Sequence, residues 1–264
     1  MPILSITEVQ RQQFATDGYL ITDVVFDEPT LAGVRRAFER MWDEDIAQAK
    51  KTGDSLAQDW AKFRPHMSQL DHRDAACRAF CHHPVFGELC RQLLGPAADL
   101  SWNQAIVKAP MPPGSRGNPA VWDNVFAWHQ DLWYALNGPY VQDCHPDLLT
   151  APDNAITCWV AVTRTTVDNG TLWVLPGRHR EGLVHHNWHA GRREWQAQVD
   201  PTFRIPVVLR AGQVLVFQKY LPHSSGTNLS DEVRMAYQIG YTVPGLNRVP
   251  SPNFSPVLRN SQLV

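Results

Sequence analysis

The chain has 264 residues, of which 44% are hydrophobic and 19% charged, and its formal net charge is −2 at pH 7. This composition is typical of a globular protein and excludes extended disorder and fibrous repeats. The basic residues are scattered, which argues against a nucleic-acid partner, and no apolar run approaches the roughly 18 residues needed to cross a membrane.

The cysteines and the N-terminus indicate a reducing compartment. No basic segment followed by an apolar core opens the chain, so we expect no secretory signal and a cytoplasmic location. The cysteines form an odd set without a C-x-x-C pair, which favours reduced thiols buried as small apolar groups. They are Cys77, Cys81, Cys90, Cys144 and Cys158.

The N-terminal part of the chain predicts helices. Thr7 and Gln10 have the spacing of a capping box, which would open a short helix that ends near Gly18. A second helix is predicted over residues 29–50, because apolar residues recur there at helical spacing. These apolar residues are Leu31, Val34, Phe38 and Met41.

Two further segments complete this helical part. Residues 49–67 are polar and mixed, so we expect a mobile loop there. A helical stretch is predicted over residues 73–94, with a break around His83 and Pro84, and it stops at the Gly95-Pro96 pair.

After residue 100 the sequence predicts strands, because short β-branched and aromatic runs alternate with turn residues. Helices followed by strands, without βαβ alternation, indicate an α+β protein that is mainly β. We predict a jelly-roll, cupin-like barrel over about residues 100–245 behind a helical layer over about residues 1–98, in a single domain spanning residues 1–264. The predicted strands are 102–109, 121–131, 155–163, 171–175, 204–209, 213–218 and 233–243.

Four His-x-Asp/Glu pairs occur, whereas random placement of 11 His and 26 acidic residues in 264 positions predicts about one. Residues i and i+2 point to the same side of a strand but diverge around a helix. Only His129 and Asp131 end a predicted strand with aromatic neighbours, so we expect both to face one cavity. The other pairs are His72/Asp74 in a helical stretch, His145/Asp147 in a loop and His179/Glu181 after a turn.

A second histidine with a downstream arginine strengthens this candidate site. His223 lies in a turn between two predicted strands, and Arg234 lies in the second of them. Two imidazoles and one carboxylate on one face of an octahedron are typical of non-haem iron(II) sites that activate oxygen. A buried guanidinium could bind the carboxylate of a co-substrate through two hydrogen bonds. In the strand, alternation places Arg234, Ala236 and Gln238 on one side and Val233, Met235, Tyr237 and Ile239 on the other.

With these segments the sequence resembles the phytanoyl-CoA dioxygenase family of iron(II)/2-oxoglutarate oxygenases, which have a double-stranded β-helix fold. The resemblance covers nearly the whole chain, and two strings are specific together: Trp-His-Gln-Asp at 128–131 and Asn-Gly…Pro-Gly-x-His at 169–179. Two departures are Arg178 and Gln213, where serine and aspartate are common. The other matching segments are 14–20, 83–86, 93–95, 108–110 and 223–234.

The resemblance implies a function for individual residues. It implies His129, Asp131 and His223 as iron(II) ligands and Arg234 as the partner of the distal carboxylate of 2-oxoglutarate. Ser225 is then a further hydrogen-bond donor to that carboxylate. Lys108 and Trp159 match positions that contact the co-substrate, although a solvated lysine and a core aromatic are the alternative interpretations.

The resemblance also implies the reaction, which is 2-oxoglutarate- and dioxygen-dependent hydroxylation with release of succinate and carbon dioxide. Asp131 argues against halogenation, whereas desaturation, epimerisation and ring formation stay open. We expect a small-molecule substrate such as a secondary metabolite, and an acyl-CoA or an amino-acid-like compound is the alternative. The candidate substrate-binding residues near the metal strands are Trp102, Gln104, Trp133, Tyr134 and Asn137.

Other classes of function compete with the oxygenase. A jelly-roll binding protein without turnover could keep the metal site, and a zinc hydrolase could use the same three ligands. Either interpretation leaves Arg234 without a chemical purpose. His185, His186 and His189 could form a second metal site, but a solvated loop over the pocket mouth is the simpler expectation. The sequence carries no signal for the oligomeric state.

Overall fold

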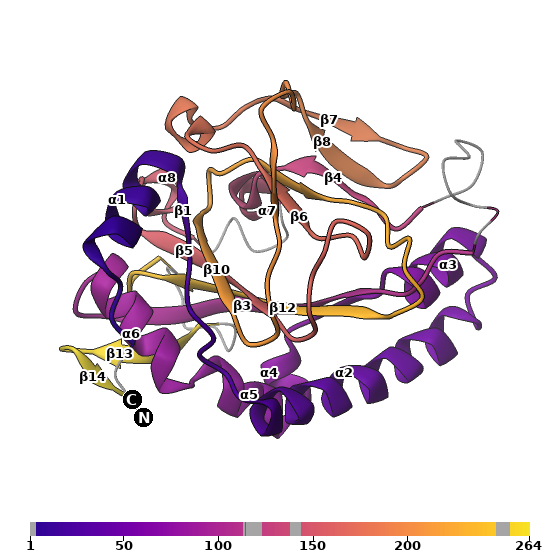
Figure 1. Ribbon diagram of the computed structural model, residues 1–264, viewed down its shortest axis with the longest axis horizontal. Helices are drawn as coiled ribbons and strands as arrows, with labels where there is room; N and C mark the ends of the chain where they lie inside the picture. The colour runs from indigo at the N-terminus through magenta and orange to yellow at the C-terminus, as the bar shows by residue number, and fades with distance from the viewer. Residues whose placement is uncertain (1–3, 113, 115–122, 138–143, 247–253) are drawn as a thin grey trace.

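The computed structural model describes residues 4–112, 114, 123–137, 144–246 and 254–264. Its largest sheet has the strand order β1-β10-β5-β12-β3-β13-β14, and β2 pairs with β3 (Figure 1). Every pairing in this sheet is antiparallel. Its strands are β1 (Tyr19–Ile21), β2 (His66–Ser68), β3 (Ala98–Lys108), β5 (Ala155–Ala161), β10 (Val214–Gln218), β12 (Arg234–Thr242), β13 (Ser255–Arg259) and β14 (Gln262–Leu263).

A smaller antiparallel sheet with the order β4-β11-β6-β9 faces the large one, and a separate β7-β8 hairpin lies beyond it (Figure 1). Two antiparallel sheets with helices outside them are the arrangement that the sequence predicted. The strands of the smaller sheet and the hairpin are β4 (Phe126–His129), β6 (Leu172–Val174), β7 (His186–His189), β8 (Glu194–Ala197), β9 (Ile205–Val207) and β11 (His223–Ser225).

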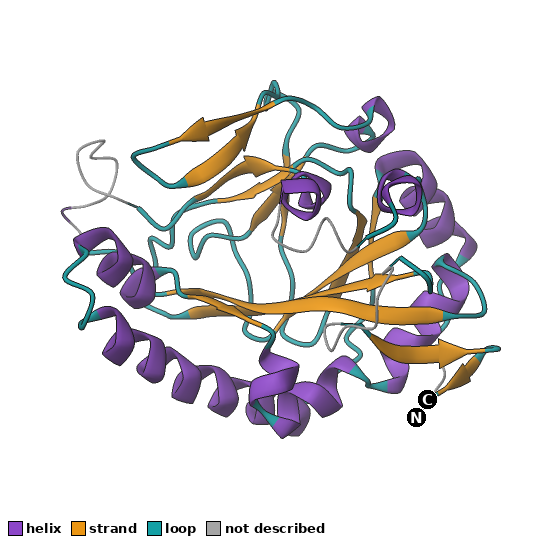
Figure 2. Cartoon of the chain, turned by 180° about the vertical axis from the view of Figure 1, so that it is seen from behind, coloured by secondary structure: helices purple, strands orange, loops and turns teal. Residues whose placement is uncertain are grey.

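Helices cover the outer face of the large sheet (Figure 2). The capping box of α1 is confirmed, since Thr7 accepts from the Gln10 backbone and Gln10 bonds back, and Gly18 ends the helix at φ +83°. The predicted second helix is also confirmed as α2, capped by Asp27. The helices are α1 (Glu8–Asp17), α2 (Glu28–Ala49), α3 (Ser55–Phe63), α4 (Leu70–Arg73), α5 (Ala75–Cys81), α6 (Pro84–Leu93), α7 (Asp131–Asn137), α8 (Pro146–Thr150) and the 3-10 turn η3 (Arg178–Glu181).

The loop expected over residues 49–67 is wrong, because α3 and β2 occupy most of it. Asp54 caps α3 by accepting from the backbone of Leu56 and Ala57. The indole of Trp42 in α2 donates to Ala61 O at 2.6 Å and holds the two helices together. The bond between Trp42 and Ala61 joins residues 19 positions apart, so local composition did not show it, whereas the Asp54 cap was a local signal that was missed.

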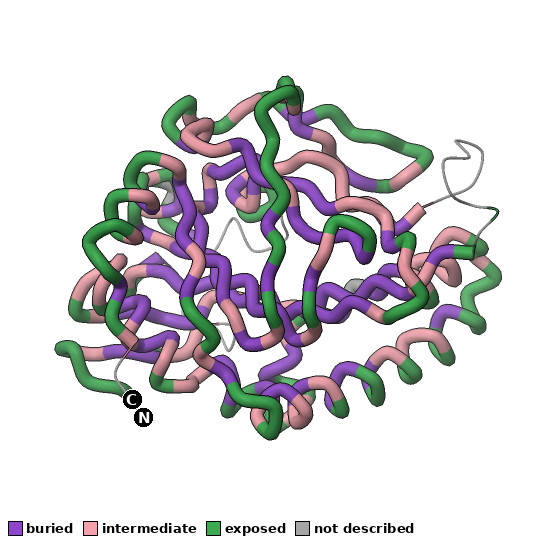
Figure 3. The backbone as a smooth tube through the Cα atoms, in the orientation of Figure 1, coloured by how far each residue is buried: buried purple, intermediate pink, exposed green. Residues whose placement is uncertain are grey.

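Strand β12 separates two apolar cores, as its alternation predicted. Met235, Tyr237 and Ile239 pack with the helices, whereas Ala236 packs between the two sheets. Every residue of β12 is buried, and in Figure 3 burial follows the central strands and the inner side of α2. The two cores together hold the large sheet rigidly between its helices and the smaller sheet.

The cysteines behave as expected: all five are free and buried. Burial raises the pKa of the Cys77 thiol to about 12, which keeps it protonated at neutral pH. None of the helices within the described residues is both long and apolar enough to span a lipid bilayer.

Candidate metal centre

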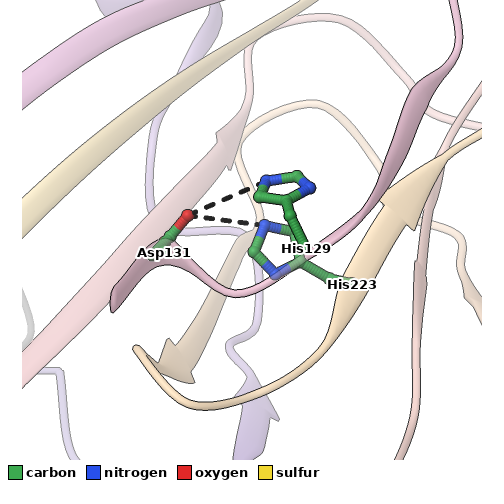
Figure 4. Close-up of side chains that lie close together, drawn as sticks. All are labelled: His129, Asp131 and His223. Carbon is green, nitrogen blue, oxygen red and sulfur yellow. Dashed lines mark ion pairs between the residues drawn. The ribbon is translucent and has the colours of Figure 1, made fainter. Parts of the chain in front are cut away.

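His129, Asp131 and His223 converge in space, as predicted. One ligand atom from each lies within 4.8 Å of the others. Asp131 Oδ1 is 3.6 Å from His223 Nε2 and 4.0 Å from His129 Nε2 (Figure 4). The two histidines are cross-strand partners in β11 and β4, which brings their rings to 4.2 Å between centroids.

The strand expected over residues 121–131 requires a correction. Residues 121–122 lie outside the described residues, β4 ends at His129, and Asp131 is the first residue of α7. The carboxylate therefore meets the imidazoles because the chain turns at Gln130, and not because i and i+2 share one face of a strand.

Gln130 holds that turn and was missed as a site residue in the sequence. It is fully buried, its Nε2 donates to Gly182 O at 2.8 Å and Tyr220 O at 2.6 Å, and its Oε1 accepts from Val184 N at 2.9 Å. The backbone N–H of Gln130 also donates to His186 Nε2 at 3.2 Å. The sequence offered one signal for this role, which is the position of Gln130 between the candidate ligands His129 and Asp131. The four hydrogen-bond partners of Gln130 lie in distant segments.

The histidine loop predicted over the pocket is also different in the structure. His186 and His189 belong to strand β7, which pairs with β8. His186 is buried and stacks on Trp133, with ring centroids 4.4 Å apart. His186 is thus a support for the Gln130 turn, and His189 is exposed.

Hydrogen bonds fix the tautomer of both ligand histidines. Nδ1 of His129 lies 2.7 Å from Ala127 O, and Nδ1 of His223 lies 3.0 Å from Leu221 O. A carbonyl oxygen can only accept, so each Nδ1 carries the proton and each Nε2 keeps its lone pair. Burial lowers the pKa of both rings, that of His223 to about 4, which keeps them neutral and able to bind metal.

Asp131 is oriented by two donors. The Thr157 hydroxyl donates to Oδ2 at 2.7 Å, and the amide of Gln238 donates to the carboxylate as well. Burial raises the pKa of Asp131, and the neighbouring His129 and these hydrogen bonds oppose that effect. With Oδ2 held in this way, Oδ1 faces the two imidazoles, which fits a carboxylate ligand to iron(II).

A small inner cavity is lined by the two ligand histidines, His129 and His223, and contains two donors without a partner among the described residues. Arg234 and Ser225 line it, and among the described residues neither Arg234 Nε nor Ser225 Oγ has a hydrogen-bond partner. The other guanidinium nitrogens donate to Ile106 O and Gly170 O, each at 3.1 Å. Burial lowers the pKa of Arg234 to about 9. A buried cation with an unpaired donor beside a hydroxyl fits a carboxylate from a bound molecule.

The two predicted co-substrate contacts differ in position. Trp159 lines the inner cavity, and the Arg234 guanidinium lies 5.4 Å from its ring centroid. Lys108 is fully buried but does not line that cavity. Its Nζ donates to the backbone carbonyls of Ser225 and Gly226, so in the structure Lys108 supports the strand that carries Ser225.

A larger outer cavity of about 530 Å³ adjoins the inner one at Gln104, Phe126 and His129, which line both. Of the predicted substrate residues, Gln104, Tyr134 and Trp102 line the outer cavity. Trp133 and Asn137 do not.

The helical register of α7 explains this difference. Trp133 packs against His186 and Trp195, and Asn137 is exposed and bonds to Trp133 O within the helix.

A family model places the chain among known proteins. Residues 14–236 match the model described as phytanoyl-CoA dioxygenase (PhyH). The chain belongs to the phytanoyl-CoA dioxygenase family. All three candidate ligands and Arg234 fall inside the matched residues, and the resemblance stated from the sequence is confirmed.

Curated relatives are similar only in part. A dioxygenase of Emericella variicolor (andF) is 27% identical over 160 residues, covering 61% of this chain and 47% of that protein. The phytanoyl-CoA dioxygenase of Arabidopsis thaliana is 30% identical over 94 residues, covering 34% of this chain and 33% of that protein. This chain therefore spans less than half the length of these two relatives.

A solved structure agrees with the fold. EvdO2 from Micromonospora carbonacea var. aurantiaca, complexed with 2-oxoglutarate, superposes with a TM-score of 0.65. It is 22% identical, and the match covers 96% of this chain and 98% of that one. The predicted jelly-roll fold with added helices is confirmed.

Proposed function

We propose that this protein is an iron(II)- and 2-oxoglutarate-dependent dioxygenase that hydroxylates a C–H bond of a small organic molecule, such as a secondary metabolite, in the cytoplasm. The observation that carries the proposal is the pair of unpaired donors, Arg234 Nε and Ser225 Oγ, in the cavity beside the His129, Asp131 and His223 cluster. A zinc hydrolase would have no use for this buried guanidinium. Membership of the family supports the same reaction class.

Different side chains would bind the metal and the co-substrate. His129 and His223 would offer Nε2 and Asp131 would offer Oδ1 to iron(II), and a metal held by three protein ligands could still bind other molecules. Arg234 and Ser225 bind the distal carboxylate of 2-oxoglutarate, and Trp159 forms part of its cavity wall. Bound iron(II) and 2-oxoglutarate supply the oxidising power with dioxygen, and succinate and carbon dioxide are the co-products.

The outer cavity supports a medium-sized organic substrate. Its volume of about 530 Å³ lies within the range for drug-sized ligands. The exposed surface of its wall is mainly apolar, and Gln104 and Tyr134 are among the side chains that contribute polar groups. Arg64 and Arg193, which line it, pair with Glu194 and Asp54, so the described part of the wall offers no cluster of basic groups to the phosphates of an acyl-CoA.

The test is anaerobic loading followed by exposure to air. Iron(II) and 2-oxoglutarate together should produce a visible charge-transfer band before oxygen enters, and a metabolite screen should then find substrates that stimulate succinate release. Asp131→Ala should lose both signals. Wild-type succinate production by Asp131→Ala would refute the ligand assignment, and a band without any stimulated turnover would favour a binding protein.

A further inference from the structure

The charged side chains that line the outer cavity are paired with one exception. Arg64 pairs with Glu194 at 3.1 Å, and Arg193 pairs with Asp54 at 2.6 Å. Asp131 belongs to the metal centre. The remaining charged group in the wall is Lys219, which the proposed reaction does not use.

Lys219 is buried without a carboxylate partner among the described residues. It is 8% exposed, and its Nζ donates to Leu149 O at 2.7 Å and to Asn154 Oδ1. An ammonium group has three donors, so these two neutral acceptors leave one N–H for a further partner, and Lys219 lines the outer cavity. Burial lowers the pKa of Lys219 to about 8, and most molecules therefore stay charged at neutral pH. The charge of Asp153 offsets this effect of burial only in part, and no carboxylate among the described residues pairs directly with Nζ. A buried ammonium without a direct ion pair is unfavourable, and groups with such perturbed pKa values are concentrated at functional sites.

The position of Lys219 connects it with the metal centre. Its carbonyl oxygen accepts from Leu132 N at 3.2 Å, and Leu132 directly follows the ligand Asp131. Thr157, which orients Asp131, lines the same cavity. A molecule that occupies this cavity can therefore contact Lys219 and the metal ligands together.

The remaining wall determines what else the molecule must contain. It is mostly apolar, and Trp60 adds an Nε1 donor that has no partner among the described residues. The two acidic groups in the wall, Asp131 and Glu194, both have partners already. The apolar and aromatic members of the wall are Trp60, Trp102, Phe126, Leu132, Tyr134, Ala135, Cys144, Leu149, Ala155, Ile156, Tyr241, Leu246 and Phe254.

We propose that the outer cavity binds a flat, mainly apolar organic acid whose anionic group pairs with the Nζ atom of Lys219. The inference rests on the proposed function for the fate of this molecule, which is the substrate. Its binding, however, depends only on the cavity and Lys219. Binding can therefore be tested without iron, 2-oxoglutarate or oxygen.

Two fluorescent probes with one carbon skeleton provide the test. 1-Anilinonaphthalene-8-sulfonate carries a sulfonate, and N-phenyl-1-naphthylamine lacks it. The wild-type protein should bind the sulfonate probe about tenfold more tightly or better, because a hydrogen bond to a charged group favours it. Lys219→Met should remove this preference while it keeps affinity for the neutral probe, and Lys219→Arg should retain the preference.

Two controls exclude unfolding and surface binding. Ala135→Trp should fill the outer cavity and weaken the binding of both probes. This result would show that the probes bind in that cavity. In the wild-type protein, 1-naphthoate should displace the neutral probe at lower concentration than 1-naphthamide does, and this measurement needs no variant. Equal affinity for acid and neutral compounds in the wild type, or an unchanged preference in Lys219→Met, would overturn the proposal.

The outcomes also separate this inference from the proposed function. Acid-selective binding without succinate release would support the Lys219 site and contradict the proposed oxygenase function. Succinate release stimulated only by neutral molecules would support the oxygenase function and contradict the Lys219 site.

Discussion

The side-chain amide of Gln238 donates to both carboxylate oxygens of Asp131, with Nε2 3.3 Å from Oδ1 and 3.2 Å from Oδ2. Gln104, directly opposite on β3, donates in turn to Gln238 Oε1 at 3.1 Å. Gln104 lines both cavities, so a side chain in the cavity wall is connected through Gln238 to the candidate metal ligand Asp131.

Removal of the hydrogen bonds that Gln238 and Thr157 donate to Asp131 should weaken metal binding. Gln238→Leu and Thr157→Val should each lower the affinity for iron(II) or manganese(II) by roughly 10- to 100-fold, because Asp131 loses the bonds that orient it. Anaerobic titration calorimetry measures this directly. Thr202→Val, in an exposed loop, is the matched control and should bind metal normally. Normal affinity in Thr157→Val and Gln238→Leu would mean that Asp131 is oriented without them.

Arg234 should select the co-substrate by its distal carboxylate. The wild-type protein should bind 2-oxoglutarate far more tightly than 2-oxobutyrate, which lacks that group. Arg234→Met should lose most of this discrimination, about 2–5 kcal/mol, while metal affinity stays within a few-fold. Ser225→Ala should lose a smaller part, about 1 kcal/mol. Full discrimination by Arg234→Met would mean that another residue binds the distal carboxylate of 2-oxoglutarate.

The ligand histidines should make the metal-free protein less stable in acid. Burial lowers the pKa of His223 from 6.5 to about 4 and also lowers that of His129. Between pH 6.5 and 4 the unfolded chain binds protons that the folded protein does not, so the free energy of unfolding falls as the pH falls. The slope is at most about 1.4 kcal/mol per pH unit for each histidine.

Urea unfolding of chelator-treated protein from pH 7 to pH 5 measures that slope. Other buried histidines contribute to it, so the comparison is with the double variant His129→Gln/His223→Gln. The variant should show a shallower dependence on pH. Parallel curves for the two proteins would show that these imidazoles are not neutral and buried in the metal-free fold.

Gly240 makes room for an aromatic wall of the outer cavity. A Cβ atom at this position would lie 2.2 Å from Trp102 Nε1, and Trp102 is the cross-strand partner of Gly240. Gly240→Ala should therefore move the indole and destabilise the protein by about 1–3 kcal/mol. The neutral naphthylamine probe should bind more weakly as well.

The matched control is Gly33→Ala in α2, where nothing lies within 4 Å of the added atom. This change should stabilise the protein by about 0.5–1 kcal/mol, because alanine favours helix. Denaturant unfolding compares the two variants, and a Gly240→Ala protein as stable as the wild type would contradict the close contact.

Several features could be predicted before the fold was known, because they depend on the order of neighbouring residues. Hydrogen-bonding side chains at Thr7 and helical spacing of apolar residues specified α1 and α2, and alternation in β12 placed Arg234 on the inner side. The ligand triad was also predicted, because a histidine pattern, a distal histidine and an arginine together resembled a known family.

Other features depend on contacts between distant segments and became visible in the folded chain. The tertiary structure placed Asp131 at the start of α7, gave Gln130 its partners, and directed Lys108, Trp133 and Asn137 away from the cavities. Lys219 likewise became a candidate anion site only through the burial of its side chain beside Leu149 and Asn154. The physical reason is that burial and hydrogen-bond partners are properties of the packed chain, whereas neighbouring residues specify only the local backbone.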